Sequence, residues 1–375
     1  MSDSLLFILL VVIIVTAMSL RTYLRRRRLK GDVGGKDDMS NTDAGRIDTP
    51  DAADAERVSS TAHRLKEARE SASATAPRRE ETLAEISHVN KSYGGRPVVQ
   101  DVSFTLAKGE VLGLVGPNGA GKTTTIRMLM DIIKPDSGEI SVFGRPLDEQ
   151  AKNRIGYLPE ERGLYRKMKV SDNLVYLSRL KAVPSNTARE RAEALLKEVD
   201  MSMHQGKKIS ELSRGMGQII QFLVTLSHDP SLIVLDEPFA GLDPVNRMLL
   251  KEIILELKTQ GKTVIFSTHM MNEVEEMCDR VLMINRGRVV LYGDLSEIKW
   301  RFRNNSVFVQ CEGDIGTIDG ISGKKDHGKY VELFLDGQTT AQQVLSQLMA
   351  KSIRVDRFEV STPSLNEIFI QVARQ

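Results

Sequence analysis

The chain has few of the residues that mark several common classes of protein. Only two of its 375 residues are cysteine, Cys278 and Cys311, which is too few for a disulfide framework and indicates a reducing compartment. Neither a CxxC motif nor a cluster of histidines is present to hold a structural metal ion. An excess of charge of one sign is also lacking, because 52 Lys and Arg face 50 Asp and Glu and leave a net charge of +2. A nucleic-acid-binding protein usually carries a clustered basic excess, so the composition predicts no nucleic-acid partner.

The near-neutral total hides three segments of different composition. Residues 1–30 carry six basic residues and one acidic residue, whereas residues 31–84 carry eight basic and twelve acidic residues. The remainder is close to neutral, and the whole chain is 41% hydrophobic and 27% charged, as is typical of globular proteins. The length allows two or three domains. We expect four units in all, at residues 1–30, 31–84, 85–300 and 301–375.

Residues 5–20 form an apolar run without a charged residue. A helix of this length spans roughly 24 Å, against roughly 30 Å for the hydrocarbon core of a bilayer, and the long side chains of Arg21 and Arg25 can reach back to the headgroups. Six basic residues follow the run and only Asp3 precedes it. The positive-inside rule then places the N-terminus outside and the rest of the chain in the cytoplasm. We therefore expect residues 1–30 to be a single transmembrane anchor in the cell (inner) membrane.

Two other interpretations of this segment stay open. A signal peptide carries its positive charge before the apolar run and a small-residue cleavage site after it, the reverse of the order here. A soluble helix would show a polar face. Residues 31–81 then contain no Phe, Tyr or Trp and are rich in Asp, Ala, Ser, Thr and Gly, so we expect a disordered linker with at most a weak helix at residues 56–70.

A phosphate-binding loop is predicted where the first continuous apolar strand, residues 111–115, leads into a GxxxxGK[ST] motif and a helix. The glycines let successive N–H groups point at phosphate oxygens, and the helix directs the positive end of its dipole at the same anion. A Gly-rich turn without a ligand is the alternative, which the flanking strand and helix disfavour. In this loop Lys122 neutralises the β- and γ-phosphates and the Thr123 hydroxyl is offered to Mg²⁺. The cofactor-binding residues expected here are Gly116, Pro117, Asn118, Gly119, Ala120, Gly121, Lys122, Thr123 and Thr124.

A second apolar strand, residues 232–236, ends in two acidic residues. Carboxylates at the C-terminal end of a buried strand lie where α/β sheets bind ligands. Asp236 is therefore expected at the Mg²⁺ ion beside Thr123, and Glu237 is placed to polarise a water against the γ-phosphate.

Seven sequence elements within residues 85–300, which occur in the same order as in the family, resemble those of the ATP-binding cassette (ABC) ATPases. The resemblance implies an α/β fold, a P-loop NTPase cassette with a RecA-like core plus antiparallel β and helical subdomains. It also implies ATP and Mg²⁺ as cofactors. The matching elements are Tyr93, residues 116–123, the segment at Glu160, residues 212–216 (LSRGM), Asp236 with Glu237, Leu242 with Asp243, and His269.

The resemblance also implies roles for these residues. Tyr93 would stack on adenine, although a lone Tyr at the end of a strand is more often a packing residue. Ser213 and the backbone of Gly215 would contact the γ-phosphate held by a second copy, so that two sites form in a head-to-tail homodimer. Asp243 would link those sites across the dimer. His269 would bond the γ-phosphate and hold the attacking water, although a single His after a strand is more often structural.

Two of these elements depart from the family pattern, the segment at Glu160 and the segment at residues 212–216. A carboxylate, Glu160, stands where an amide is usual. It can still bind Mg²⁺ as a harder, anionic ligand, although it adds negative charge near the phosphates. In residues 212–216, which match the LSGGQ signature of the family, Arg214 and Met216 replace Gly and Gln. Arg214 is either a phosphate partner or an exposed side chain.

Residues 301–375 are predicted to form a small α+β domain with strands at 307–311, 331–335 and 353–360 and a helix at 341–349. A final helix starts near Pro363, where Ser364 and Glu367 have capping-box spacing. The ending PSLNEIFI and the LPEERGLY segment at residues 158–165 resemble the sodium-extrusion and drug-export ATPases, and that resemblance implies a separate multi-span permease.

These features predict a function. One cassette occurs, and a single apolar segment cannot form a translocation path, so we expect an ATP-hydrolysing subunit that energises a separate membrane permease. The ATPase domain would lie on the cytoplasmic side. The tethered architecture keeps a second interpretation open, a membrane-bound ATP-dependent regulatory switch that moves no solute. A ribosome or DNA-repair ATPase fits less well, since a second cassette and a coiled-coil insertion are lacking.

Overall fold

The computed structural model describes residues 81–161, 163–303, 305–311, 315–351 and 353–373. The expected anchor at residues 1–30 and nearly all of the expected linker at residues 31–84 therefore lie outside the described residues. Within the part of the chain that is described, no helix combines the length and the apolar character that a membrane crossing requires.

A six-stranded sheet lies at the centre of the fold. Its strand order is β5-β6-β7-β3-β8-β9, with neighbouring strands parallel from β5 to β8 and β9 antiparallel to β8. Alternate residues of β3 face opposite sides, because Val111 and Val115 join one core and Leu112 and Leu114 join the other. Burial on both faces explains why the strands read as continuous apolar runs. The strands are β3 (Val111–Val115), β5 (Ile155–Leu158), β6 (Leu232–Asp236), β7 (Thr263–Thr268), β8 (Arg280–Asn285) and β9 (Arg288–Asp294).

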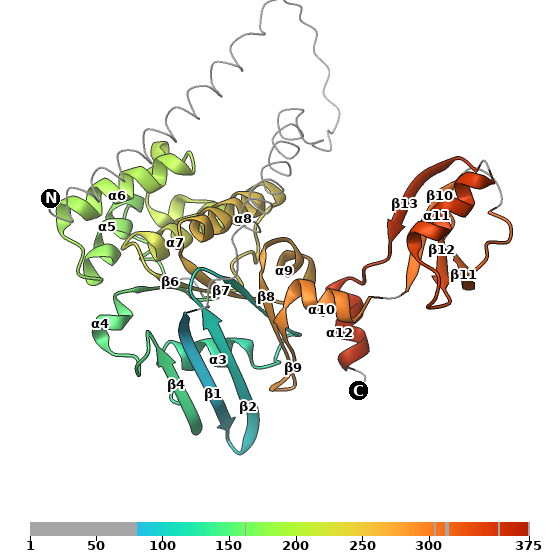
Figure 1. Cartoon of the computed structure of the whole chain (residues 1–375). Coiled ribbons are helices and arrows are strands. Elements are labelled where there is room, and N and C mark those ends of the chain that lie inside the picture. The colour runs from blue at the N-terminus through green and yellow to red at the C-terminus, as the bar shows by residue number, and fades with distance from the viewer. Residues whose placement is uncertain (1–80, 162, 304, 312–314, 352, 374–375) are drawn as a thin grey trace, which may run out of the picture.

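One face of this sheet is covered by an antiparallel three-stranded sheet, in the order β2-β1-β4, and by α3. Figure 1 shows β1, β2 and β4 below the central sheet. Ile86, Phe104 and Ile126 are among the buried side chains that join these layers. The elements are β1 (Thr82–Tyr93), β2 (Arg96–Ala107), α3 (Lys122–Leu129), β4 (Ser137–Val142) and the short α4 (Glu149–Lys152).

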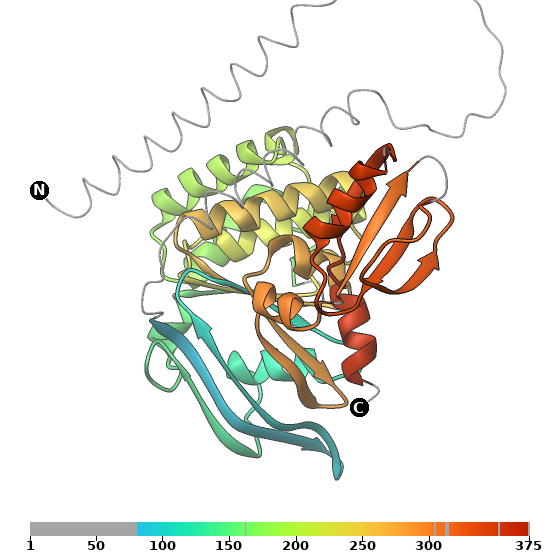
Figure 2. The same cartoon turned by 45° about the vertical axis from the view of Figure 1, so that its right-hand side comes forward.

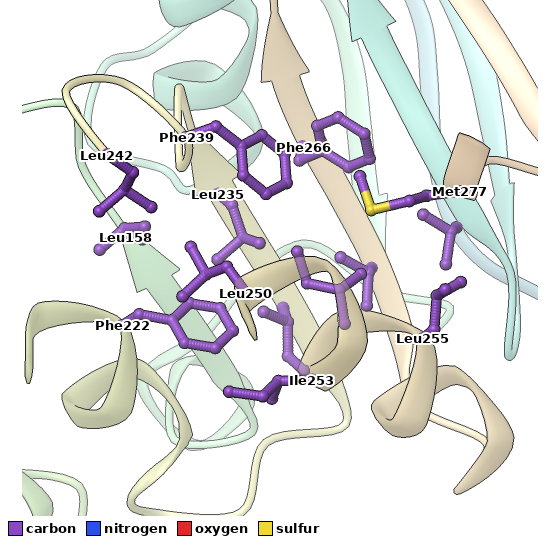
Figure 3. Close-up of a cluster of buried hydrophobic side chains, with 14 of the residues drawn as sticks. Leu158, Phe222, Leu235, Phe239, Leu242, Leu250, Ile253, Leu255, Phe266 and Met277 are labelled. Atoms are coloured by element: carbon purple, nitrogen blue, oxygen red, sulfur yellow. The ribbon is translucent and has the colours of Figure 1, made fainter. Parts of the chain in front are cut away.

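The opposite face is covered by helices, and Figure 1 shows α5 to α8 above the sheet. Figure 3 shows Phe222 of α7 and Leu250 of α8 packed on the strands, with Phe239 and Phe266 beside them. The rings of Phe239 and Phe266 meet edge to face, with centroids 5.8 Å apart. This core fixes the loops at the C-terminal ends of β6 and β7. The helices are α5 (Val170–Leu180), α6 (Ser185–Glu198), α7 (Arg214–Leu226), α8 (Pro244–Thr259), α9 (Met271–Met277) and α10 (Leu295–Arg301), with 3₁₀ turns at Ser202–His204 and Ile209–Glu211.

The C-terminal unit is a separate antiparallel sheet, in the order β11-β12-β10-β13, with α11 packed on one face. Val307, Leu333 and Val344 lie in its small core. The expected strands and helix are present, but β11 was not predicted and β13 starts at Val355 rather than at residue 353. The elements are β10 (Ser306–Cys311), β11 (Ile321–Asp326), β12 (Val331–Leu335), α11 (Ala341–Ala350) and β13 (Val355–Val360).

The final helix, α12 (Leu365–Ala373), leaves this unit and packs on the larger one. Leu365 and Ile368 are buried in the helical core, and the backbone N–H of Leu365 donates to the side chain of Glu275 on α9. Figures 1 and 2 both show α12 apart from the C-terminal sheet, near α10 and β9. The expected capping contacts form at the N-terminus of α12, where the Ser364 N–H donates to the Glu367 carboxylate at 2.7 Å.

Candidate nucleotide-binding site

The loop between β3 and α3 wraps around the ammonium group of Lys122. This side chain is 6% exposed, and its Nζ donates to the carbonyl of Gly116 at 2.8 Å and to that of Pro117 at 3.4 Å. Two glycines are required here. A Cβ on Gly116 would lie 2.1 Å from the carbonyl oxygen of Ile284, and Gly121 has φ 107°. Gly121 caps α3 without a side chain, so the first N–H groups of the helix point outward as anion donors.

Strand β2 and the turn between β8 and β9 hold this loop from one side. The Gly287 N–H donates to Ala120 at 2.9 Å, and the Gln100 N–H donates to Gly287 at 2.8 Å. A Cβ on Gly121 would lie 2.8 Å from the carbonyl oxygen of Val98 in β2. The three-stranded sheet therefore contributes to the position of the loop.

Asp236 lies beside Thr123 at the end of β6. Its Oδ1 accepts from the Thr123 hydroxyl at 3.2 Å and from the Ser267 hydroxyl at 2.6 Å. The residue is 1% exposed, and its Oδ2 is buried with no hydrogen-bond partner among the described residues. A buried carboxylate oxygen normally has a partner, so this atom fits a Mg²⁺ ligand. The pKa of the neighbouring Tyr157 is raised, mainly by burial and to a lesser degree by the negative charge of Asp236.

Glu237 lies between a lysine and a histidine. Its Oε1 is 3.5 Å from Lys122 Nζ, and its Oε2 is 3.0 Å from His269 Nδ1. The backbone of Glu237 is held with φ 48°, and its N–H donates to the Ser267 hydroxyl at 2.9 Å. A carboxylate oriented in this way can accept a proton from a water beside the γ-phosphate.

Ser213, Gly215 and Asp243 form a second group at two neighbouring helix N-termini. Ser213 accepts from the Met216 N–H at 3.2 Å, and Asp243 accepts from the Asn246 N–H at 3.0 Å. Burial raises the pKa of Asp243, but the hydrogen bonds that the backbone and side chain of Asn246 donate to its carboxylate hold the pKa below its ordinary value. A Cβ on Gly215 would lie 3.5 Å from Asp243 Oδ2, so the two turns touch.

This second group is separate from the first. In the described part of the chain, no hydrogen bond joins Ser213, Gly215 or Asp243 to the phosphate loop, Asp236, Glu237 or His269. Ser213 and Asp243 are both exposed. Arg214 is exposed too, beside the turn at Gly241, where a Cβ would lie 3.5 Å from its Nε.

Tyr93 and Glu160 are the remaining predicted site residues. Tyr93 ends β1, is 49% exposed and has the ammonium of Lys91 5.9 Å from its ring centroid. It lies in the hairpin whose second strand contacts Gly121. Glu160 is exposed and, within the described ranges, makes no hydrogen bond with Thr123 or Asp236.

Sequence reasoning missed two residues that organise this site. Ser267 bridges Asp236 and the backbone of Glu237, and Gln221 on α7 donates to the carbonyls of Pro159 at 3.2 Å and Glu161 at 3.0 Å, on either side of Glu160. Both are at most 4% exposed. A polar residue within an apolar strand or helix was the available signal, because such a residue needs a specific partner.

We expect Ser267→Ala to lower the free energy of unfolding by about 2 kcal/mol, because it removes two buried hydrogen bonds, one of them to a carboxylate. It also frees Asp236, so half-maximal ATPase activity should need several-fold more Mg²⁺. Urea unfolding and a Mg²⁺ titration measure the two effects. The control is Ser178→Ala, because Ser178 Oγ is buried without a hydrogen-bond partner in the described structure. Equal Mg²⁺ requirements in wild type and Ser267→Ala would contradict this role.

Comparison with known proteins places this geometry in a family. Residues 99–240 match the ABC transporter family model, and residues 293–373 match the model of the ATP-binding protein DrrA1-3-like C-terminal domain. The uncharacterized ABC transporter ATP-binding protein YhaQ of Bacillus subtilis (strain 168) is 40% identical over 289 residues, which cover 76% of this chain and 97% of the relative. The linearmycin resistance ATP-binding protein LnrL of the same organism is 30% identical, over 77% of this chain and 98% of the relative.

A solved structure from the same family has a similar fold. The ATP-binding subunit of an ABC transporter superposes with a TM-score of 0.55 at 31% identity, over 59% of this chain and 93% of the other. Members of this family bind ATP, normally with Mg²⁺, and associate with the cytoplasmic face of membranes. They work as dimers with membrane permease partners. Because nearly the whole length of YhaQ and LnrL is matched, this chain belongs to the ABC transporter ATP-binding proteins and is an ATPase.

Proposed function

We propose that this chain is the ATP-hydrolysing subunit of an export-type transporter and energises a separate membrane-spanning permease. The observation that carries the proposal is the C-terminal unit, whose model match is to DrrA1-3-like ATP-binding proteins. Two relatives support it: the linearmycin resistance ATP-binding protein LnrL, matched over 98% of its length, and a Nod factor export ATP-binding protein, 39% identical over 212 residues.

The geometry supports a division of labour within the first group of site residues. Lys122 and the N–H groups of the phosphate loop bind the phosphates, with Thr123 and Asp236 as the ligands of Mg²⁺. When bound, the ion neutralises charge that develops on the phosphate oxygens. Glu237 accepts the proton of the attacking water, and His269 orients that carboxylate at 3.0 Å. Tyr93 offers an exposed ring face to adenine, and Glu160 is proposed as a further Mg²⁺ ligand.

The second group supports a head-to-tail dimer. Ser213, Gly215 and Asp243 lie at helix N-termini, where N–H groups favour an anion, yet they do not reach the phosphate loop of their own chain. A second copy would bring them to the γ-phosphate. ATP would then close the dimer, hydrolysis would open it, and the permease would alternate its access.

Purification of the full-length chain from its native membrane tests the transporter proposal. We expect a multi-span membrane protein to co-purify, and vesicles holding both proteins to move a solute only with hydrolysable ATP. The Lys122→Ala chain is the control and should support no flux. A single-span or envelope partner whose state changes with ATP, without flux, would replace the proposal by a regulatory switch.

Membrane attachment through residues 1–30 is a separate proposal. We expect the full-length chain to stay with membranes through alkaline extraction and a chain starting at residue 31 to be released, because a spanning helix inserts in an effectively irreversible way and a surface association does not. Release of both chains would contradict an anchor.

A further inference from the structure

Glu273 is a fully buried carboxylate behind the active site. It lies on α9, four residues after His269, and is 0% exposed. Its Oε2 accepts from the hydroxyl of Thr268 at 3.0 Å, and that hydroxyl oxygen accepts from the Met270 N–H at 3.0 Å. Glu273 therefore fixes the residues on both sides of His269.

The other oxygen of Glu273 forms a long ion pair with Arg247 but no hydrogen bond. Glu273 Oε1 and Arg247 Nε are 3.8 Å apart, and each atom is buried with no hydrogen-bond partner in the described structure. This separation exceeds that of a charge-assisted hydrogen bond, which is about 2.8 Å. Two buried groups of opposite charge that form only a long ion pair are stabilised further when they come within hydrogen-bonding distance.

Arg247 belongs to the turn that carries Asp243. It lies in the first turn of α8, and its N–H donates to the carbonyl of Asp243 at 3.0 Å. A displacement of the Asp243 turn therefore moves Arg247 with it, and roughly 1 Å of movement toward α9 would bring the guanidinium within bonding distance of Glu273.

We propose that Arg247 and Glu273 are positioning residues whose contact closes when a second copy engages the Asp243 turn, and that this closure fixes His269 against Glu237. The proposal rests on the dimer proposed above. Neither residue touches the phosphate loop, so their action passes through Thr268 and His269, whose Nδ1 is 3.0 Å from Glu237. Closure thereby holds in place, in the dimer, the contact between His269 and Glu237 that the single chain already makes at 3.0 Å.

The chain offers a matched control. Lys251 and Glu276 join the same two helices one turn further along, and their side chains are already in contact, at 2.5 Å. Glu276 is half exposed, and neither residue contacts Asp243 or the Thr268 turn through a hydrogen bond in the described part of the chain. Glu276→Gln thus removes an ion pair between α8 and α9 and leaves Arg247 and Glu273 unchanged. Burial raises the pKa of Glu273, and Lys251 stays close enough to that carboxylate to offset part of the rise.

The test compares Glu273→Gln, Arg247→Gln, Arg247→Lys and Glu276→Gln in the full chain. The amide of Glu273→Gln can still accept from Thr268 but has no charge to attract Arg247. We expect kcat to fall about tenfold in Glu273→Gln and Arg247→Gln, with KM within twofold of wild type and the Hill coefficient for ATP reduced toward 1. The double variant should lose no more than either single one. Arg247→Lys should recover part of kcat, and Glu276→Gln should match wild type in kcat and Hill coefficient.

Thermal melting of each variant separates positioning from folding. If kcat and the Hill coefficient of folded Glu273→Gln and Arg247→Gln equal those of Glu276→Gln, the positioning role is overturned. Size-exclusion chromatography of Glu237→Gln with ATP checks the dimer independently. A monomer there overturns the dimer and this inference together, whereas a dimer with unaffected Glu273→Gln kinetics overturns this inference alone.

Discussion

Glu237→Gln is expected to bind ATP about as tightly as wild type and to hydrolyse it at least a hundredfold more slowly. The amide keeps the size of the carboxylate and can accept a hydrogen bond from Lys122, but it cannot take a proton from water. General-base catalysis contributes roughly 10²–10⁴ in rate. Nucleotide binding should persist because Lys122, Thr123 and Asp236 remain. ATP should therefore accumulate in a closed dimer.

Phosphate release, nucleotide affinity and size-exclusion chromatography with ATP measure these three effects. Glu149→Gln is the control, because Glu149 is 89% exposed and pairs with Lys152 at 2.8 Å on the surface. Undiminished turnover in Glu237→Gln would show that another group accepts the proton. Loss of ATP binding would instead assign Glu237 a structural role beside Lys122.

The local motifs of this site could be predicted because neighbouring residues build them. The phosphate loop requires glycine where the backbone of Ile284 or Val98 approaches, and those glycines stand in the sequence at fixed spacing from Lys122. Asp236 could likewise be placed at the ligand-binding edge, since a carboxylate at the C-terminal end of a buried parallel strand lies where such sheets bind ligands.

The connections between motifs could not be predicted, because they depend on register. Ser267 reaches Asp236 only because β6 and β7 pair with these two residues opposite each other. The approach of Arg247 to Glu273 also depends on the tertiary structure, because the two residues lie on α8 and α9, the helices before and after β7. The helix α12 was predicted from its capping box, but its apolar face does not reveal whether it covers its own sheet or the larger core.

The strand β11 shows a different limit. Its sequence, ISGKKD, has neither apolar alternation nor β-branched residues after Ile321, and its exposed residues pair with β12 at the edge of the sheet. An edge strand with two lysines lacks the hydrophobic signal from which strands are predicted.

Lys122→Ala is expected to weaken ATP binding by tenfold or more and to reduce hydrolysis at least a hundredfold. A charged hydrogen bond contributes roughly 1.5–3 kcal/mol, and the ammonium would serve both phosphates. The substitution also removes the cation that lies 3.5 Å from Glu237, so that carboxylate would repel the γ-phosphate. Equilibrium binding and phosphate release measure the effects.

Lys122→Ala should also differ in kind from Glu237→Gln. The double variant should fail to trap a dimer with ATP, because binding through Lys122 precedes any role of Glu237. Lys152→Ala is the control, since it removes the cation of the surface pair with Glu149. An ATPase rate in Lys122→Ala equal to that of Lys152→Ala would refute the assignment of the phosphate loop. A trapped dimer in the double variant would show that phosphate is held by the N–H groups of the loop and the start of α3 alone.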